Sequence, residues 1–232
     1  MPRTLDCEGD SANISLRSGS RSGKRPRQGR DRSLRETRQR YGTAVAVADT
    51  SARPAVAAKL AALLSVAALI AVGLGVYAGV HSPAGRPIFT LGFSGMLQMK
   101  GWLTTIVAAL VLVQVVTAQW MWGKLPGVTG TPSFVGPLHR WSGTTAFVVS
   151  LPVAFHCLWA LGFGVGSVRV VAHGVAGCVF YGAYASKMLG LRMRGLPART
   201  LPVLGGIVVA CVVLLWLTAA LWFFTRSGLP LI

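Results

Sequence analysis

The strongest constraint on this chain is a series of five apolar segments, each long enough to cross a bilayer. A helix needs about 20 predominantly apolar residues to span the hydrocarbon core. The segments cover residues 59–80, 99–123, 139–163, 168–189 and 201–224. Tryptophans lie near their ends, where these amphipathic rings prefer the membrane interface. The sequence therefore predicts an all-α fold, a five-helix transmembrane bundle.

Charge is distributed very unevenly along the chain. All six acidic residues precede residue 50, and the last of them is Asp49. The predicted bundle therefore carries basic side chains without a single carboxylate side chain. Proton relays, cation-coupled transport and general acid/base hydrolysis usually depend on Asp or Glu, so the composition argues against these mechanisms. Anionic groups, such as lipid headgroups or the propionates of a cofactor, are the favoured partners.

The first 58 residues differ from the rest of the chain in composition. They contain twelve Lys and Arg, many Ser and Gly, and few large apolar residues. Such a segment cannot bury enough apolar surface to fold alone, so we expect a disordered basic tail at residues 1–58 and a transmembrane domain at residues 59–225. The Arg-rich stretch lacks interleaved aromatic residues. Contact with anionic lipid is therefore favoured, and no nucleic-acid partner is expected.

Basic residues also predict the orientation in the membrane. Cytoplasmic segments of membrane proteins carry an excess of Lys and Arg. With the N-terminus inside, the tail, Lys124, Arg140, Lys187 and the loop at residues 190–200 lie on the cytoplasmic side. Fewer basic residues then lie outside. We expect a multi-pass protein of the cytoplasmic (inner) membrane, with its N-terminus inside and its C-terminus outside.

Histidines are the candidate functional residues within the predicted spans. His156 and His173 lie at equal distances in sequence from the midpoint of the short turn between the third and fourth segments. These two segments should form an antiparallel hairpin of direct neighbours. At about 1.5 Å per residue, the two imidazoles then lie at nearly the same depth. Neutral imidazole is a common axial ligand of haem, so the pair predicts a haem b iron held by His156 and His173.

Neighbouring residues are compatible with a haem and also with a simpler role. Arg169 lies one turn from His173 and is placed to pair with a propionate, while His81 is a third candidate ligand at the end of the first segment. However, small residues around His173 more often indicate close helix packing. In the alternative interpretation, the two histidines bind no cofactor and simply hydrogen-bond each other or Gln114. His139 is best explained as an interfacial contact.

Two blocks of sequence carry a resemblance to a known family. These are LHRWSGTTAFVVSLPVAFHCLWALGF and RVVAHGVAGCVFYGAYASK, with HSP at residues 81–83 and QWMWGKLP near the end of the second segment. They resemble an uncharacterised multi-pass membrane family of high-GC bacteria. More distantly, histidines on successive helices look like those of b-type cytochrome and ferric-reductase-like membrane domains, which hold two haems between paired histidines. This chain supports one such pair at most, and it has no soluble flavin or nicotinamide domain.

These observations lead to two hypotheses of function. In the first, the protein is a small b-haem electron-transfer protein that uses His156, His173, His81 and Arg169, with an unknown membrane or redox partner. In the second, it is a cofactor-free accessory or scaffold subunit of a membrane complex. No independent enzyme activity is indicated. The cysteines show no paired spacing, and the last three, Cys157, Cys178 and Cys211, are interpreted as small buried hydrophobic residues.

Overall fold

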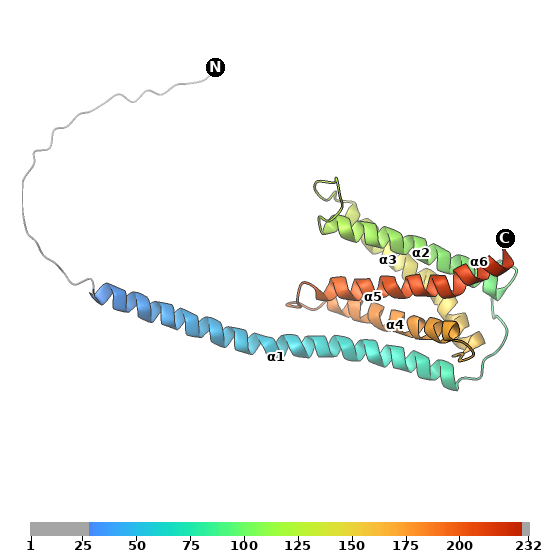
Figure 1. Ribbon diagram of the computed structural model, residues 1–232, viewed down its shortest axis with the longest axis horizontal. Helices are drawn as coiled ribbons and strands as arrows, with labels where there is room; N and C mark the ends of the chain where they lie inside the picture. Colours follow the sequence, from blue (N-terminus) through green and yellow to red (C-terminus); the bar gives the residue numbers. More distant parts are fainter. Residues whose placement is uncertain (1–27, 229–232) are drawn as a thin grey trace, which may run out of the picture. The chain divides into compact units, whose positions relative to one another are not determined.

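A computed structural model describes the backbone of residues 28–228 and the side chains of residues 35–40 and 54–228. Within these residues every regular element is helical. The helices are α1 (Gln28–Val80), α2 (Met96–Met121), α3 (Val135–His156), α4 (Val168–Gly190), α5 (Thr200–Leu215) and α6 (Trp222–Ser227). Two π-helical turns, η1 (Cys157–Leu161) and η2 (Trp216–Leu221), continue α3 and α5 (Figure 1).

Five stretches of these helices are long and apolar enough to cross a membrane. They are Pro54–Val80, Met96–Met121, Val135–Leu161, Val168–Gly190 and Thr200–Ser227. Each matches one predicted segment to within a few residues. The prediction of an all-α, five-helix, multi-pass membrane protein is therefore confirmed.

Helix α1 begins well before the first predicted span. Residues 28–58, assigned by the sequence to a disordered tail, belong to this helix, whereas residues 1–27 lie outside the described part of the chain. The sequence offers a physical reason. Glu36 precedes Arg40 by four residues, which is the order and spacing of opposite charges that stabilises an isolated helix.

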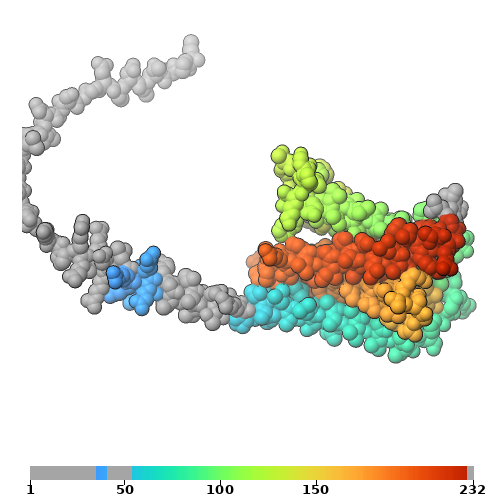
Figure 2. All heavy atoms as spheres, in the orientation of Figure 1, coloured from blue at the N-terminus to red at the C-terminus, as the bar shows by residue number. Residues whose placement is uncertain are grey.

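Helices α1 and α4 pack through small residues and backbone carbonyls. A Cβ atom added to Gly182 would overlap the carbonyl oxygen of Ala67, so only glycine permits this approach. One turn further along α4, the Ser186 hydroxyl donates a 2.6 Å hydrogen bond to the carbonyl of Leu63. Close packing at small residues is a common way to join helices in a bilayer. The contact fixes α1 alongside α4, as the space-filling view shows (Figure 2).

Helices α2 and α3 are joined by a polar network. The Gln114 side-chain amide donates a hydrogen bond to the Ser142 hydroxyl at 2.7 Å and another to the carbonyl of His139. A Cβ atom added to Gly143 would lie 3.0 Å from the Gln114 side-chain oxygen. The helices therefore pack closely where the network lies, and the partly buried amide of Gln114 is satisfied within the pair.

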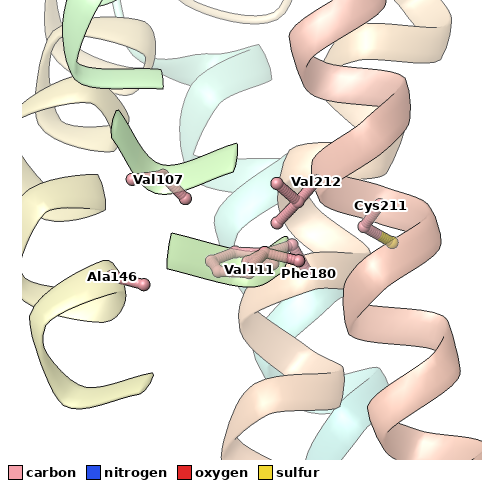
Figure 3. Close-up of a cluster of buried hydrophobic side chains, with 6 residues drawn as sticks. All are labelled: Val107, Val111, Ala146, Phe180, Cys211 and Val212. Atoms are coloured by element: carbon pink, nitrogen blue, oxygen red, sulfur yellow. The ribbon is translucent and has the colours of Figure 1, made fainter. Parts of the chain in front are cut away.

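The central core lies between α2, α3, α4 and α5. Its buried side chains are Val107, Val111, Ala146, Phe180, Cys211 and Val212 (Figure 3). The closest backbone pairings are α2 with α3 and α4 with α5. Helices α3 and α4 are consecutive, yet they meet mainly through side chains: Phe147 stacks on Tyr184 at 4.4 Å, and the Ser150 and Tyr181 hydroxyls are 2.9 Å apart. The predicted hairpin of direct neighbours is therefore splayed, because bulky rings hold the two backbones apart.

The end of the bundle where α1 and α3 finish and α2 and α4 begin is called the His81 end. Here the loop after α1 caps the end of η1, since the amides of Ala84 and Gly85 donate to the carbonyls of Trp159 and Ala160. Gly162 ends η1 with a φ of +65°, and a Cβ atom there would lie 2.9 Å from Pro83. The positive φ and the short distance to Pro83 each require glycine at this position. These contacts close the α1–α2 loop onto the α3–α4 turn.

The α1–α4 contact gives a direct test of the fold. Gly182→Ala should lower the free energy of unfolding by about 1–3 kcal/mol, because the added methyl group overlaps the Ala67 carbonyl. Gly206→Ala is the matched control, since a Cβ atom there meets nothing within 4 Å. Thermal unfolding of the purified variants in detergent measures the difference. Equal stability of the two variants would contradict this account of the packing.

Candidate functional site

A cavity of about 410 Å³ lies at the His81 end of the bundle. All five long helices contribute to its wall, and so do both π-helical turns. Ligand pockets in proteins usually measure about 300–1,000 Å³, so the cavity is large enough for a small organic molecule. Most of its wall is apolar. Its polar and titratable lining residues are Lys100, Thr104, Ser150, Cys157, Arg169, His173, Cys178, Tyr181 and Thr218.

Three basic side chains, Lys100, Arg169 and His173, share this cavity. Lys100, from the first turn of α2, is 7% exposed. Because the chain has no Asp or Glu after Asp49, no acidic side chain from the bundle can balance the charges of Lys100 and Arg169. A buried cation without a counter-charge is costly, so the cavity favours a ligand that carries negative charge.

Arg169 is held in position by the end of the last transmembrane segment. Its guanidinium donates a 2.6 Å hydrogen bond to the carbonyl of Thr218. Its Cζ atom also lies 4.1 Å from the centre of the Trp222 ring. Arg226 lies over the same ring at 5.1 Å, but it does not line the cavity. Arg169 therefore presents a fixed, oriented charge at the cavity wall.

The hydrogen bonds of His173 determine which ring nitrogen carries the proton. Its Nδ1 lies 2.9 Å from the Thr218 hydroxyl oxygen. That hydroxyl gives its single hydrogen to the carbonyl of Leu214 at 2.6 Å, so it must accept from Nδ1–H of His173. In the neutral ring, Nε2 then carries a lone pair. This nitrogen is available as a metal ligand or a proton acceptor.

Cys157, the first residue of η1, has a free thiol that lines the same cavity. Lys100 and His173 line this cavity as well. The three side chains come from α2, η1 and α4. A sulfur atom, an imidazole and an ammonium group are thus brought together from distant parts of the sequence.

His156 is placed differently from His173. It is completely buried, its Nδ1 donates to the carbonyl of Pro152 at 2.8 Å, and its ring meets Phe89 edge-on at 4.6 Å. It does not line the cavity, although Ala154 and Cys157 do. At about 100° per residue, His156 lies on another face of the helix from these two. Its Nε2 atom is buried without a hydrogen-bond partner among the described residues.

His81 lies in an aromatic cluster outside the cavity. Its ring stacks on Tyr77 at 5.2 Å and lies 4.7 Å from Trp159, and its buried Nε2 has no hydrogen-bond partner in the described part of the protein. Of the four residues expected to hold a haem, the cavity therefore brings together His173 and Arg169, but not His156 or His81. One iron held between the imidazoles of His156 and His173 does not fit this geometry.

No group of three or more His, Cys, Asp or Glu side chains suited to a metal ion occurs in the described residues. At the opposite end, the Nδ1 of His139 lies 2.8 Å from the Thr117 hydroxyl. His139 thus belongs to the network that joins α2 and α3.

Sequence reasoning missed Lys100, Cys157 and Thr218 as site residues. In the sequence, Lys100 resembles an ordinary charged residue at the membrane interface. Cys157 resembles a small apolar residue within a span. Their common signal is position: each lies near the same end of its predicted span as Arg169 and His173. That signal indicates depth in the membrane but not which helix face a residue occupies.

Comparison with known proteins gives one family match. No curated protein and no solved structure matches the chain significantly. The sequence model of a family of unknown function, DUF6529, matches residues 59–231, which include the whole cavity wall. Since this match covers most of the chain, the protein belongs to the DUF6529 family.

Proposed function

We propose that this membrane protein binds, in the cavity at the His81 end, one apolar molecule that carries an acidic group. The observation that supports the proposal is the presence of Lys100, Arg169 and His173 in one largely apolar cavity of a carboxylate-free bundle. The acidic group lies between Arg169 and Lys100, where charge-assisted hydrogen bonds are available. The apolar body extends toward Val107, Phe180 and Val212, which form the deeper wall.

Two molecules of this chemistry are considered, a fatty acid or other anionic lipid and haem b. Both join carboxylate or phosphate groups to a large apolar body. The lipid requires only the basic residues and the apolar wall. Haem b also requires a ligand to its iron, and the Nε2 lone pair of His173 favours it specifically.

In the haem proposal, His173 alone ligates the iron while Arg169 and Lys100 hold the propionates. The Thr218 hydroxyl fixes the ring orientation of His173, as partners of ligating histidines commonly do. Bound haem b would supply one-electron transfer in the membrane. The electron donor and acceptor are then other molecules, because the described chain contains no domain beyond its helices.

The bundle orientation is a further part of the proposal. With the N-terminus inside the cytoplasmic membrane, the His81 end faces outward and the basic tail faces the anionic inner leaflet. Two of the basic residues at the His81 end, Lys100 and Arg169, line the cavity. The exposed basic side chains described at the His81 end are then Arg86 and Arg226. The outer surface of the bundle therefore carries fewer positive charges than the inner surface.

Binding of an acidic ligand is tested with palmitate and its neutral methyl ester. Arg169→Gln should weaken palmitate binding about tenfold or more, because a charge-assisted hydrogen bond contributes roughly 1.5–3 kcal/mol. Binding of the methyl ester should change little. Arg226→Gln is the matched control, since Arg226 lies over the same Trp222 ring outside the cavity. Equal loss for the acid and its ester would contradict the proposed charge recognition.

Haem binding is tested by recording the visible absorption spectrum of the purified protein in its oxidised and reduced states, together with a haem extraction assay. His173→Ala should remove the haem, because it removes the one imidazole that lines the cavity. His156→Ala should retain it in variants that remain folded. Absence of haem with lipid recovered by mass spectrometry would select the lipid. Recovery of neither, with no palmitate binding, would favour the accessory-subunit hypothesis.

Orientation is tested with a membrane-impermeant thiol reagent on intact cells. In a background lacking the native cysteines, Arg86→Cys should be labelled from outside and Arg194→Cys only after the cells are opened. Both positions are exposed, and they lie in the α1–α2 loop and the α4–α5 loop respectively. External labelling at residue 194 would reverse the proposed orientation.

A further inference from the structure

We propose that Cys157 is a nucleophilic thiol that accepts an acyl chain from a long-chain acyl thioester and holds it in the cavity. The inference deepens the proposed function, because it assumes that an acyl chain occupies the same apolar space. It adds a covalent site and a substrate class to that proposal.

The first argument is the charge around the thiol. The thiolate is the reactive form of cysteine, and nearby cations favour it. Lys100 and Arg169 line the same cavity as Cys157, and the bundle contains no carboxylate side chain that would oppose the thiolate. Lys100 is more than nine-tenths buried, so its charge is weakly screened by water.

The second argument is the proton acceptor. Because Nδ1 of His173 donates to Thr218, the neutral ring carries its lone pair on Nε2, the nitrogen left for the thiol. Cysteine next to a histidine that is oriented by a third group is a recurring arrangement in nucleophilic catalysis. Thr218 is the orienting group, and it comes from η2 rather than from the helices that carry the cysteine and the histidine.

The step balances without an oxidant or a reductant. His173 takes the thiol proton, and the sulfur of Cys157 attacks the carbonyl carbon of the acyl thioester. A new carbon–sulfur bond to Cys157 forms as the bond to the donor's sulfur breaks. The proton returns from His173 to the departing thiolate. During the attack, negative charge develops on the carbonyl oxygen, and the Lys100 ammonium group, which belongs to the same cavity wall, stabilises it.

The cavity provides space for the chain beyond the thiol. From Cys157, the cavity wall continues along α3 to Ser150, a helical distance of about 10 Å at 1.5 Å per residue. Val107 and Val212 line the same deeper part from the other helices. An acyl carbonyl at Cys157 therefore places its chain among apolar residues and its leaving group toward Lys100 and Arg169.

The other two cysteines of the bundle are natural controls. Cys178 also lines the cavity, but its sulfur packs against α1, where a Cβ atom added to Gly75 would lie 3.8 Å from it. Cys211 lies in the hydrophobic core. Of the three cysteines in the bundle, Cys157 is therefore expected to be the reactive one because of its neighbours, and not because of its depth in the membrane alone.

The experiment incubates the full-length protein in lipid vesicles with palmitoyl-coenzyme A and locates adducts by mass spectrometry. An adduct that neutral hydroxylamine removes should form on Cys157, at a rate that exceeds those of Cys178 and Cys211. Cys157→Ser should abolish this adduct. Equal acylation of the three cysteines, or no adduct on Cys157 of the folded protein, would overturn the inference.

Lys100 and His173 variants separate chemistry from folding. Lys100→Gln should slow acylation roughly 100-fold, as expected for loss of an oxyanion donor, while Lys100→Arg should restore much of the rate. His173→Gln should slow it by a similar factor. An unchanged rate in Lys100→Gln would count against the assigned role. Palmitate binding without acylation would refute this inference alone, whereas acylation of Cys157 without palmitate binding would refute only the proposed function.

Discussion

Every charged side chain beyond Asp49 is basic, and this restricts how the bundle satisfies its buried polar groups. Ion pairs between helices are unavailable to it. The helices are instead joined by neutral hydrogen bonds to backbone carbonyls, such as that from Ser186 to Leu63, and by the amide of Gln114. In a bilayer, where apolar surface gives helices little reason to associate, such contacts and close packing at small residues hold the bundle together. The basic groups at the cavity have no acidic side chain to balance their charge, which makes that region the favoured place for an anion.

The cavity exists because α3 and α4, although consecutive, do not pack against each other along their whole length. Phe147, Tyr181 and Tyr184 separate α3 from α4. The π-helical turns η1 and η2 then border the opening that results, and they carry Cys157 and Thr218. A π-helical turn adds a residue to the helical repeat and so rotates the rest of the helix about its axis, and such turns occur frequently at functional sites. Here they bring the thiol and the orienting hydroxyl onto the cavity wall.

The sequence predicted the fold well because length and composition decide whether a segment spans a bilayer. It predicted the site less well, and the histidines show why. His156 and His173 are symmetric about the α3–α4 turn in sequence, which indicates similar depth. Rotation about each helix axis decides what a side chain faces, and a difference of one residue changes it by about 100°. Cys157 lines the cavity with Lys100 and His173, while its neighbour His156 contacts Phe89 outside the cavity. The splay of α3 and α4 depends on tertiary contacts that no local pattern encodes.

The two ends of the bundle use the same kinds of polar residue in different ways. Near the opposite end, His139, Thr117, Gln114 and Ser142 bind one another across the closely packed α2–α3 pair. Their hydrogen bonds serve to join the helices, so they have little capacity left for a ligand. At the His81 end, Thr218 orients His173 and supports Arg169 through its carbonyl, yet the reactive nitrogen and the guanidinium still line the cavity. Polar groups held by a neighbour on one side and open to a cavity on the other are preorganised for binding. This difference, rather than the number of histidines, supports the proposed binding site at the His81 end.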